Sequence, residues 1–108
     1  MGRRRRFAIT YAPEVSRHVD AIPRQFHSQI RRASQARLSL EPQVATRNRK
    51  PLEDQPGPFG STWELRRSAA NRFRVFYEVR ADTREVWVLA AGLKDRDRLF
   101  FAGREFVP

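Results

Sequence analysis

A stretch of strict alternation near the middle of the chain constrains the fold more than any other feature. From residue 72 to residue 79, large apolar side chains occupy the odd positions and mostly polar ones the even positions: Arg72, Phe73, Arg74, Val75, Phe76, Tyr77, Glu78, Val79. Because successive side chains of a strand point to opposite faces of its sheet, one face should be buried and the other should display Arg72, Arg74 and Phe76. A rigid sheet that presents guanidinium groups suits a polyanion, since phosphate oxygens accept paired hydrogen bonds from arginine.

Neighbouring segments complete a three-stranded antiparallel meander. Strands are expected over residues 62–68, 71–80 and 85–91. The turns between them are expected at Ser68–Asn71 and at Ala81–Arg84, where polar and small side chains interrupt the apolar pattern.

The N-terminal half predicts one strand and two helices. Residues 6–11 alternate as a strand, a short helix follows between Pro13 and Pro23, and a second helix runs from Arg24 to Leu40. The second helix carries an apolar stripe at helical spacing: Phe26, Ile30, Ala33, Leu40. Two helices with so short a joint form a hairpin, and the sheet is the only surface on which they can bury their apolar sides. The chain is therefore expected to be an α+β domain of order β-α-α-β-β-β.

Composition bounds the class of partner. The chain has 108 residues, no cysteine and a formal net charge of +10, so one domain over residues 1–108 is expected, with residues 1–5 as a flexible basic arm. Such an excess of positive charge implies an acidic partner, either nucleic acid or an acidic protein, and a basic surface without a specific partner is the alternative. No apolar run approaches the roughly 18 residues of a membrane span, so no membrane contact and a cytoplasmic location are expected.

A basic loop is expected between the helices and the meander. Residues 41–60 contain four of the seven prolines, and Arg47, Arg49 and Lys50 lie among them. Two interpretations remain open for this loop. It either grips an RNA phosphate backbone or serves as a solvated connector.

The sequence offers no metal or cofactor site. His18 and His27 lie nine residues apart on different expected helices, whereas a metal site needs three or four converging ligands. Both histidines are therefore expected to be surface or partly packed residues. The acidic residues are scattered along the chain, which argues against a two-metal nuclease centre, and there is no glycine-rich phosphate loop.

The residues that remain for chemistry are basic and lie on or after the strands: Arg66, Arg72, Arg74, Lys94, Arg96, Arg98. They suit metal-free RNA cleavage, in which the 2′-hydroxyl attacks the neighbouring phosphorus and fixed cations stabilise the charge that grows in the transition state. Arginine is a poor proton carrier, so Arg74 is expected to act electrostatically and Lys94 is the candidate acid.

Two further interpretations concern the same face. Phe76 lies among the arginines and is the candidate for stacking on a base, whereas Trp63, Tyr77 and Trp87 are expected in the core. The alternative for the strand arginines is structural, because strand arginines often pair across a sheet with glutamates, here Glu64, Glu78, Glu85.

Three segments follow one another from Trp63 to Gly103: Trp-Glu-Leu-Arg, then Arg-Phe-Arg-Val-Phe-Tyr-Glu-Val, then Val-Leu-Ala-Ala-Gly-Leu-Lys-Asp-Arg. Their order resembles the RelE/ParE superfamily of bacterial type II toxins, and the resemblance covers residues 6–106. It implies the β-α-α-β-β-β fold. It also implies that Arg74, Lys94 and Arg96 are catalytic and that Arg66 is the matching basic position on the preceding strand. Together with the basic loop and the arginine-bearing face, this predicts a wider RNA-binding set: Arg47, Arg49, Lys50, Arg66, Arg72, Phe76, Arg98.

The chain departs from the superfamily's ribosome-dependent branch at two places. Glu64 stands where that branch has lysine, and Phe100-Phe101 stands where it has tyrosine, which phenylalanine cannot replace as a proton donor. The resemblance implies a ribosome-dependent mRNA endonuclease that inhibits translation and is held silent by an antitoxin in a hetero-oligomer. Two alternatives stay open. The chain could be a gyrase-inhibiting toxin or a basic RNA-binding module without catalytic activity.

Overall fold

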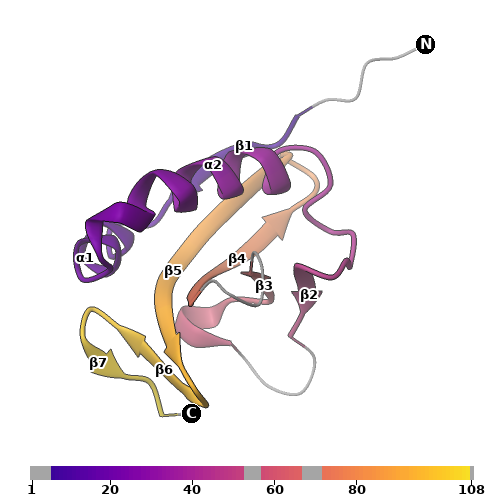
Figure 1. Cartoon of the computed structure of the whole chain (residues 1–108). Coiled ribbons are helices and arrows are strands. Elements are labelled where there is room, and N and C mark those ends of the chain that lie inside the picture. Colours follow the sequence, from indigo (N-terminus) through magenta and orange to yellow (C-terminus); the bar gives the residue numbers. More distant parts are fainter. Residues whose placement is uncertain (1–5, 53–56, 67–71, 108) are drawn as a thin grey trace.

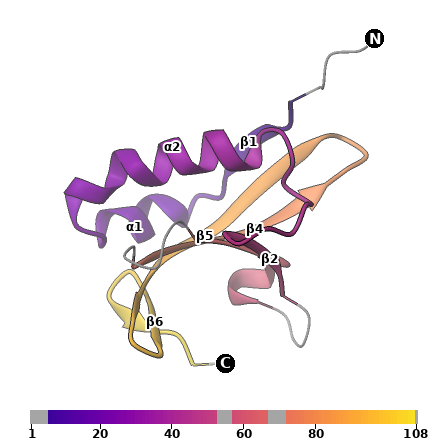
Figure 2. The same ribbon diagram turned by 45° about the vertical axis from the view of Figure 1, so that its right-hand side comes forward.

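A strongly curved sheet with two helices on its convex side organises the structure (Figures 1 and 2). The structure is a computed structural model that describes residues 6–52, 57–66 and 72–107. Its helices and strands, in chain order, are β1 (Ala8–Tyr11), α1 (Val15–Asp20), the 3-10 helix η1 (Arg24–Phe26), α2 (His27–Leu38), β2 (Arg49–Pro51), the 3-10 helix η2 (Pro58–Gly60), β3 (Trp63–Arg66), β4 (Phe73–Arg80), β5 (Glu85–Asp95), β6 (Arg98–Phe101) and β7 (Arg104–Glu105).

The sheet is larger than the expected meander. Its strand order is β2-β3-β4-β5-β6-β7, with antiparallel pairing throughout, and β1 pairs in parallel with β5. The α+β class, the N-terminal strand, the two helices and the three central strands are confirmed. The three strands expected after the helices are present but do not complete the sheet, because β2 forms inside the expected loop and β6 and β7 extend the sheet beyond β5. The expected turn at Ser68–Asn71 and the arm at residues 1–5 lie outside the described residues.

The helix-covered face of the sheet holds the main core. Phe73, Val75 and Tyr77 are at most 1% exposed, as the alternation predicts, and they pack with Val86 and Val88 of β5 beneath the helices. The Tyr77 hydroxyl donates a hydrogen bond of 2.8 Å to the carbonyl oxygen of Pro42, and burial raises the pKa of this tyrosine well above its usual value. The helix-covered face therefore forms a closed apolar core, which contains the buried Tyr77–Pro42 hydrogen bond.

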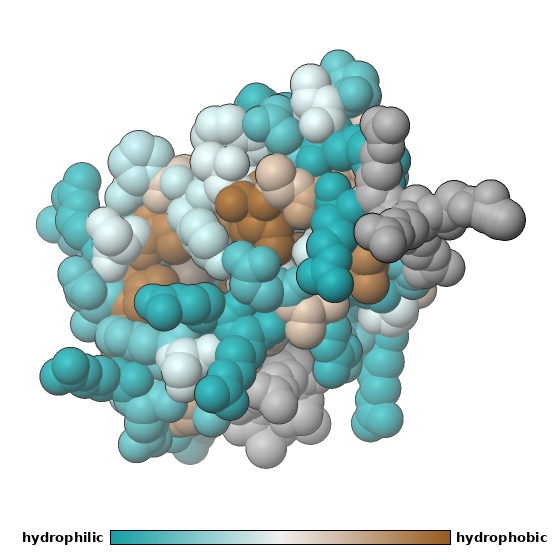
Figure 3. Space-filling view, turned by 90° about the horizontal axis from the view of Figure 1, so that it is seen from above, coloured by the Kyte–Doolittle hydropathy of each residue, from teal (hydrophilic) through white to brown (hydrophobic). Residues whose placement is uncertain are grey.

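The helices match the expected hairpin with one shift in the buried stripe. Phe26 and Ile30 contact the core as expected, and Leu38 is fully buried, but Leu40 is 38% exposed. The reason is that α2 ends at Leu38, so the helical spacing that would have placed Leu40 on the stripe does not extend that far. Seen from the helix side, the surface is mostly hydrophilic with small separate apolar areas (Figure 3). None of the described helices is long and apolar enough to cross a membrane.

His18 closes a break in the edge of β5. The strand β1 pairs with residues 85–88 of β5 and β6 pairs with residues 93–95, so the two strands share one edge and leave a gap between them. In that gap the backbone N–H of Ala91 donates a hydrogen bond of 3.2 Å to Nδ1 of His18. His18 is only 5% exposed, and burial lowers its pKa, which the nearby Glu14 partly offsets. The expectation of a surface or partly packed histidine is therefore wrong for His18, whose neutral ring replaces a strand partner.

A second apolar cluster occupies the concave face. Phe76, Ala90 and Phe101 are buried there, and Phe106 packs edge-on against Phe101 with ring centroids 5.9 Å apart. Gly92 allows β6 to fold this closely across β5, because a Cβ at residue 92 would lie 2.8 Å from the Phe100 carbonyl oxygen. The C-terminal strands thus cover part of the face that the alternation alone predicts to be open.

Candidate functional site

A pocket on the concave face brings together charged residues from five strands, β3 to β7. It has a volume of about 390 Å³ and is named here the Arg74 pocket. Its walls come from η2, from strands β3 to β7, and from the residues after β7: Pro58, Glu64, Arg74, Phe76, Lys94, Asp97, Arg98, Leu99, Glu105, Phe106, Val107.

Arg74 is the most constrained charged residue of this pocket. Its side chain is only 10% exposed, and its Nε lies 3.3 Å from Oε2 of Glu64 on the neighbouring strand. Its Nη1 also donates a hydrogen bond of 2.9 Å to the carbonyl oxygen of Phe73. Burial lowers the pKa of Arg74, Glu64 opposes that change, and Arg66, its register partner on β3, adds to it. The guanidinium is thereby held in one orientation before any ligand arrives.

Glu64 links two cations and explains one departure from the family pattern. Its second oxygen, Oε1, lies 3.8 Å from Nζ of Lys50, which pairs with it across β2 and β3. The sequence alternative that the strand arginines pair with glutamates is confirmed for Arg74. A lysine at residue 64 would be a third cation beside Lys50 and Arg74. Glu64 instead supplies a carboxylate that fixes the direction of the Arg74 side chain.

The outer wall of the pocket carries both basic and acidic side chains. Lys94 of β5 and Arg98 of β6 line it together with Asp97 and Glu105. Arg98 donates hydrogen bonds of 3.2 Å and 2.9 Å to the two carboxylate oxygens of Glu105, and this pairing lowers the pKa of Glu105. The pocket is thus lined by Arg74, Lys94 and Arg98 and by an equal number of acidic residues, although the net charge of the chain is +10.

The gathering of acidic residues is not evident from the order of the chain. Glu64 is far in sequence from Asp97 and Glu105, yet all three line the Arg74 pocket. Within residues 6–52, 57–66 and 72–107, no group of three His, Asp or Glu side chains is arranged to hold a metal ion. The period-two pattern of β3 could have placed Glu64 beside Arg74, but no local signal identifies Glu105, because β7 depends on the turn before it.

Several residues expected at the site lie elsewhere. Arg96 is exposed at the tip of the β5–β6 turn, with a φ of +57°, and does not line the Arg74 pocket. Arg72 is exposed and lines a different pocket on the helix side. Arg47 is exposed ahead of β2.

Alternation within β2 separates two of the expected RNA-binding residues. Lys50 pairs with Glu64 and reaches the concave side, whereas Arg49 pairs with Leu65 of the main core. Arg49 donates a hydrogen bond through Nη1 to the carbonyl oxygen of Arg37 in the last turn of α2. Its position therefore favours a structural role at the end of the helix.

Phe76 cannot serve as an open stacking surface. It is only 4% exposed and packs against Phe101 with ring centroids 5.7 Å apart. The expectation that it is displayed beside the arginines is wrong, because β6 and Phe106 pack over it. Phe101 is also buried, whereas Phe100 points to the helix side and lines the pocket that contains Arg72.

The fold matches that of a known toxin–antitoxin complex. The crystal structure of the complex RelBE2 from Mycobacterium tuberculosis contains a chain that superposes with a TM-score of 0.66 and 19% sequence identity. The match covers 82% of this chain and 99% of that chain. No protein-family model and no curated protein matches the sequence. The chain therefore shares its fold with a chain of this toxin–antitoxin complex, and the α+β arrangement agrees with the one that the order of residue types predicts.

Proposed function

We propose that this chain, with its RelE-like fold, is the toxin of a bacterial type II toxin–antitoxin pair and cleaves mRNA on the ribosome. The observation that carries the proposal is the preorganised guanidinium of Arg74. Glu64 and the Phe73 carbonyl hold it in a pocket that Lys94 and Arg98 also line. Preorganised donors are the largest contributors to transition-state stabilisation when charge grows on oxygen, because they need no reorganisation during the reaction.

The geometry supports a division of roles. The 2′-hydroxyl of the RNA loses its proton to water and attacks the neighbouring phosphorus, the bond from phosphorus to the 5′-oxygen breaks, and a 2′,3′-cyclic phosphate forms. Arg74 stabilises the charge on the phosphoryl oxygens, and Lys94, which lines the same pocket, donates a proton to the leaving oxygen. Arg66 beside Arg74 and Lys50 beside Glu64 hold the flanking phosphates. Arg96 and Arg47, which are exposed outside the pocket, serve as outer contacts to RNA or ribosome.

The partner follows from the same charges. An antitoxin segment with acidic side chains would mask Arg74, Lys94 and Arg98 and form a hetero-oligomer in the cytoplasm. Such a segment is expected to fold on binding, with electrostatic attraction speeding association at low salt.

One observation favours a second function. The Arg74 pocket has equal numbers of acidic and basic side chains in its walls, and none of its described lining residues is a tyrosine. A gyrase-inhibiting toxin needs a protein-binding surface rather than a proton donor, so this alternative explains Glu64 and Phe101 without further assumptions. A basic RNA-binding module without catalytic activity is a third candidate.

Induced expression in a bacterial host separates these functions. The proposal predicts rapid loss of protein synthesis, with mRNA cut at defined positions in primer extension and relief when the adjacent acidic gene product is co-expressed. Intact mRNA with a DNA-damage response and filamentation would instead establish the gyrase function. Unchanged growth at verified expression would reject both toxin functions.

A further inference from the structure

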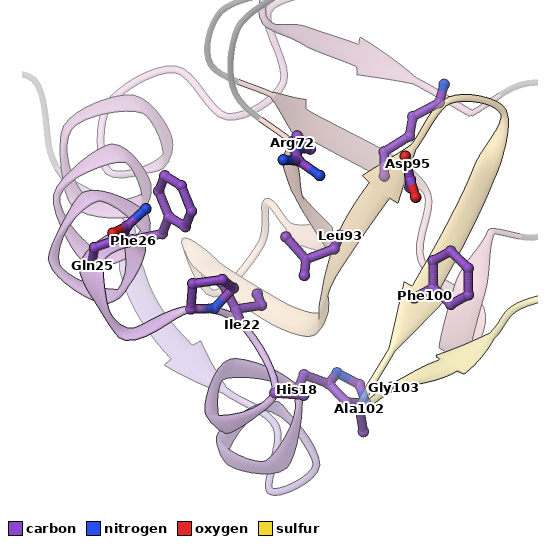
Figure 4. A pocket seen from close by; sticks show the side chains of 13 residues that line it. His18, Ile22, Gln25, Phe26, Arg72, Leu93, Asp95, Phe100, Ala102 and Gly103 are labelled. Atoms are coloured by element: carbon purple, nitrogen blue, oxygen red, sulfur yellow. The ribbon is translucent and has the colours of Figure 1, made fainter.

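A second pocket lies on the other side of β5 from the Arg74 pocket, between the helical hairpin and the β6–β7 hairpin. It has a volume of about 370 Å³ and is named here the Phe26–Phe100 pocket (Figure 4). This volume falls within the range of about 300–1,000 Å³ that is usual for small-ligand sites. The features that define it are two aromatic rings, an apolar floor and a rim of polar side chains: Ile22, Phe26, Arg72, Leu93, Lys94, Phe100.

The two rings stand on opposite sides of the pocket. Phe26 comes from η1 and Phe100 from β6, and Leu93 and Ile22 lie between them (Figure 4). Both rings are only partly buried, so part of each ring faces solvent or the pocket. Flat apolar walls of this kind suit a planar ring, because a base has two π-faces that stack on phenylalanine regardless of its identity.

The rim offers hydrogen-bonding groups for the edge of such a ring and for a phosphate. Arg72 and Lys94 supply cations, Gln25 supplies both donors and an acceptor, and Asp95 supplies acceptors. His18 also lines the pocket, and because its Nδ1 accepts the Ala91 N–H, the proton of the neutral ring is on Nε2. Among the described residues this Nε2–H has no hydrogen-bond partner, so it remains a donor for a ligand.

Lys94 connects the two pockets. Among the described residues, it is the one that lines both the Arg74 pocket and the Phe26–Phe100 pocket. A nucleic acid strand that places one phosphate at Arg74 could therefore cross Lys94 and continue to Arg72 on the other side of β5. Single-stranded RNA is recognised in this manner, with splayed bases stacked on aromatic side chains and read at their edges.

We propose that the Phe26–Phe100 pocket binds one nucleotide of single-stranded RNA, next to the nucleotide held in the Arg74 pocket. The base stacks on Phe26 or Phe100, Gln25 and Asp95 contact its edge, and Arg72 and Lys94 bind the adjacent phosphate. The choice of RNA as the ligand rests on the proposed function.

Binding of a fluorescein-labelled eight-nucleotide single-stranded RNA to the full chain tests this site. Phe26→Leu and Phe100→Leu remove the aromatic face but keep most of the apolar volume, and Arg72→Gln removes one cation. Tyr11→Leu and Arg32→Gln are matched controls, because both residues are exposed and neither lines the two pockets. A parallel RNA with 4-thiouridine is crosslinked by light and the attached residue is identified by mass spectrometry.

The proposal predicts that Phe26→Leu or Phe100→Leu weakens binding by about fivefold or more, the lower end of what base stacking contributes. Arg72→Gln should reduce the slope of log affinity against log salt by about 0.7, and the two controls should leave affinity and slope unchanged. Crosslinks should fall on residues of the Phe26–Phe100 pocket. Wild-type affinity in all three variants, with crosslinks elsewhere, would overturn the proposal.

The outcome is separable from that of the proposed function. If Arg74→Ala abolishes mRNA cleavage while the three pocket variants bind and cut as the wild type does, the nuclease function holds and the nucleotide site is wrong. If the wild-type chain cuts no mRNA but the pocket variants lose RNA affinity, the nucleotide site holds and the nuclease function is wrong.

Discussion

Side chains on the two faces of the sheet are buried by different kinds of interaction. On the helix-covered face, Phe73, Val75 and Tyr77 are almost completely buried among apolar neighbours, and helices close the layer. On the concave face, the same strand presents Arg74, which is buried through an ion pair with Glu64, and Phe76, which is covered by β6. The apolar burial of the first face stabilises the fold. On the second face, burying a charged side chain in a fixed orientation costs folding free energy, which is typical of functional sites.

A core substitution should show the largest effect on stability. Phe73 is 1% exposed on the helix-covered face, so Phe73→Ala should lower the free energy of unfolding by about 3–5 kcal/mol, through lost burial and the cavity left behind. Val107→Ala at a 77% exposed position should change it by less than about 0.5 kcal/mol. Urea unfolding measures both values.

Substitutions on the helix-covered face should leave the rate of mRNA cleavage per folded molecule unchanged. If Phe73→Ala does not fold, Phe73→Leu keeps most of the volume and should cost less than about 1.5 kcal/mol. A folded Phe73→Leu protein with strongly reduced mRNA cleavage would show that the two faces do not have separate roles.

The ion pair on the concave face should matter for both stability and activity. Glu64→Gln leaves the Arg74 guanidinium with a weaker partner in a site where its side chain is 10% exposed. We expect a loss of about 1–3 kcal/mol in the free energy of unfolding and a fall in mRNA cleavage, because Arg74 is no longer held in direction.

Glu78→Gln is the matched control. Glu78 also pairs with an arginine, at 3.7 Å from Arg80, but both side chains are more exposed, at 29% and 48%. An exposed pair contributes at most about 1 kcal/mol, so this variant should resemble the wild type. Equal effects of the two substitutions would show that the buried Glu64–Arg74 pair contributes no more than an exposed ion pair does.

The Tyr77–Pro42 hydrogen bond within the main core should contribute less to the free energy of unfolding. Tyr77→Phe removes the hydroxyl that binds the Pro42 carbonyl oxygen and should cost about 1–2 kcal/mol. Tyr11→Phe, at a 40% exposed position, serves as the control and should be neutral. Chemical unfolding of the two variants, side by side, checks the difference.

The smallest expected effect is a pH dependence that comes from His18. Burial lowers the pKa of His18 in the folded state below its ordinary value of 6.5, so the unfolded chain binds more protons than the folded chain in this window. The contribution to stability is therefore complete above about pH 6.5 and is lost as the pH falls from there through the folded pKa.

His18→Asn isolates this contribution. The wild type should lose more stability between pH 8 and 5 than the variant does, measured as the urea midpoint at each pH. A parallel decline in both proteins would assign the pH dependence to other groups.

The sequence predicts the helix-covered face well because one physical rule governs it. Period-two alternation identifies Phe73, Val75 and Tyr77, and helical spacing identifies Phe26 and Ile30. The same rule fails for Phe76, since alternation assigns a residue to a face but does not say whether a second layer covers that face. Alternation assigns Arg74 to the correct face of the sheet, but it does not predict that this side chain is buried.

The missing layer depends on turns with weak local signals. The β6–β7 hairpin turns through Ala102 and Gly103, both with positive φ, at +50° and +79°. Such a turn usually carries Asn-Gly or Asp-Gly, so Ala102 conceals it from a reading of the sequence. Glu105 and Phe106 follow this turn, and their place in the Arg74 pocket could therefore not be predicted.

The most direct test of the account is the single-turnover rate of mRNA cleavage in a translating extract by Arg74→Ala, compared with the wild type and Arg32→Gln. Loss of one preorganised donor raises the barrier by about 2–4 kcal/mol, so the rate should fall by about 30- to 1,000-fold. Unfolding measurements on the same samples confirm that the protein is folded, and Arg32→Gln should cleave as the wild type does. A folded Arg74→Ala protein that cleaves mRNA at the wild-type rate would contradict the central claim that the concave face is the catalytic face.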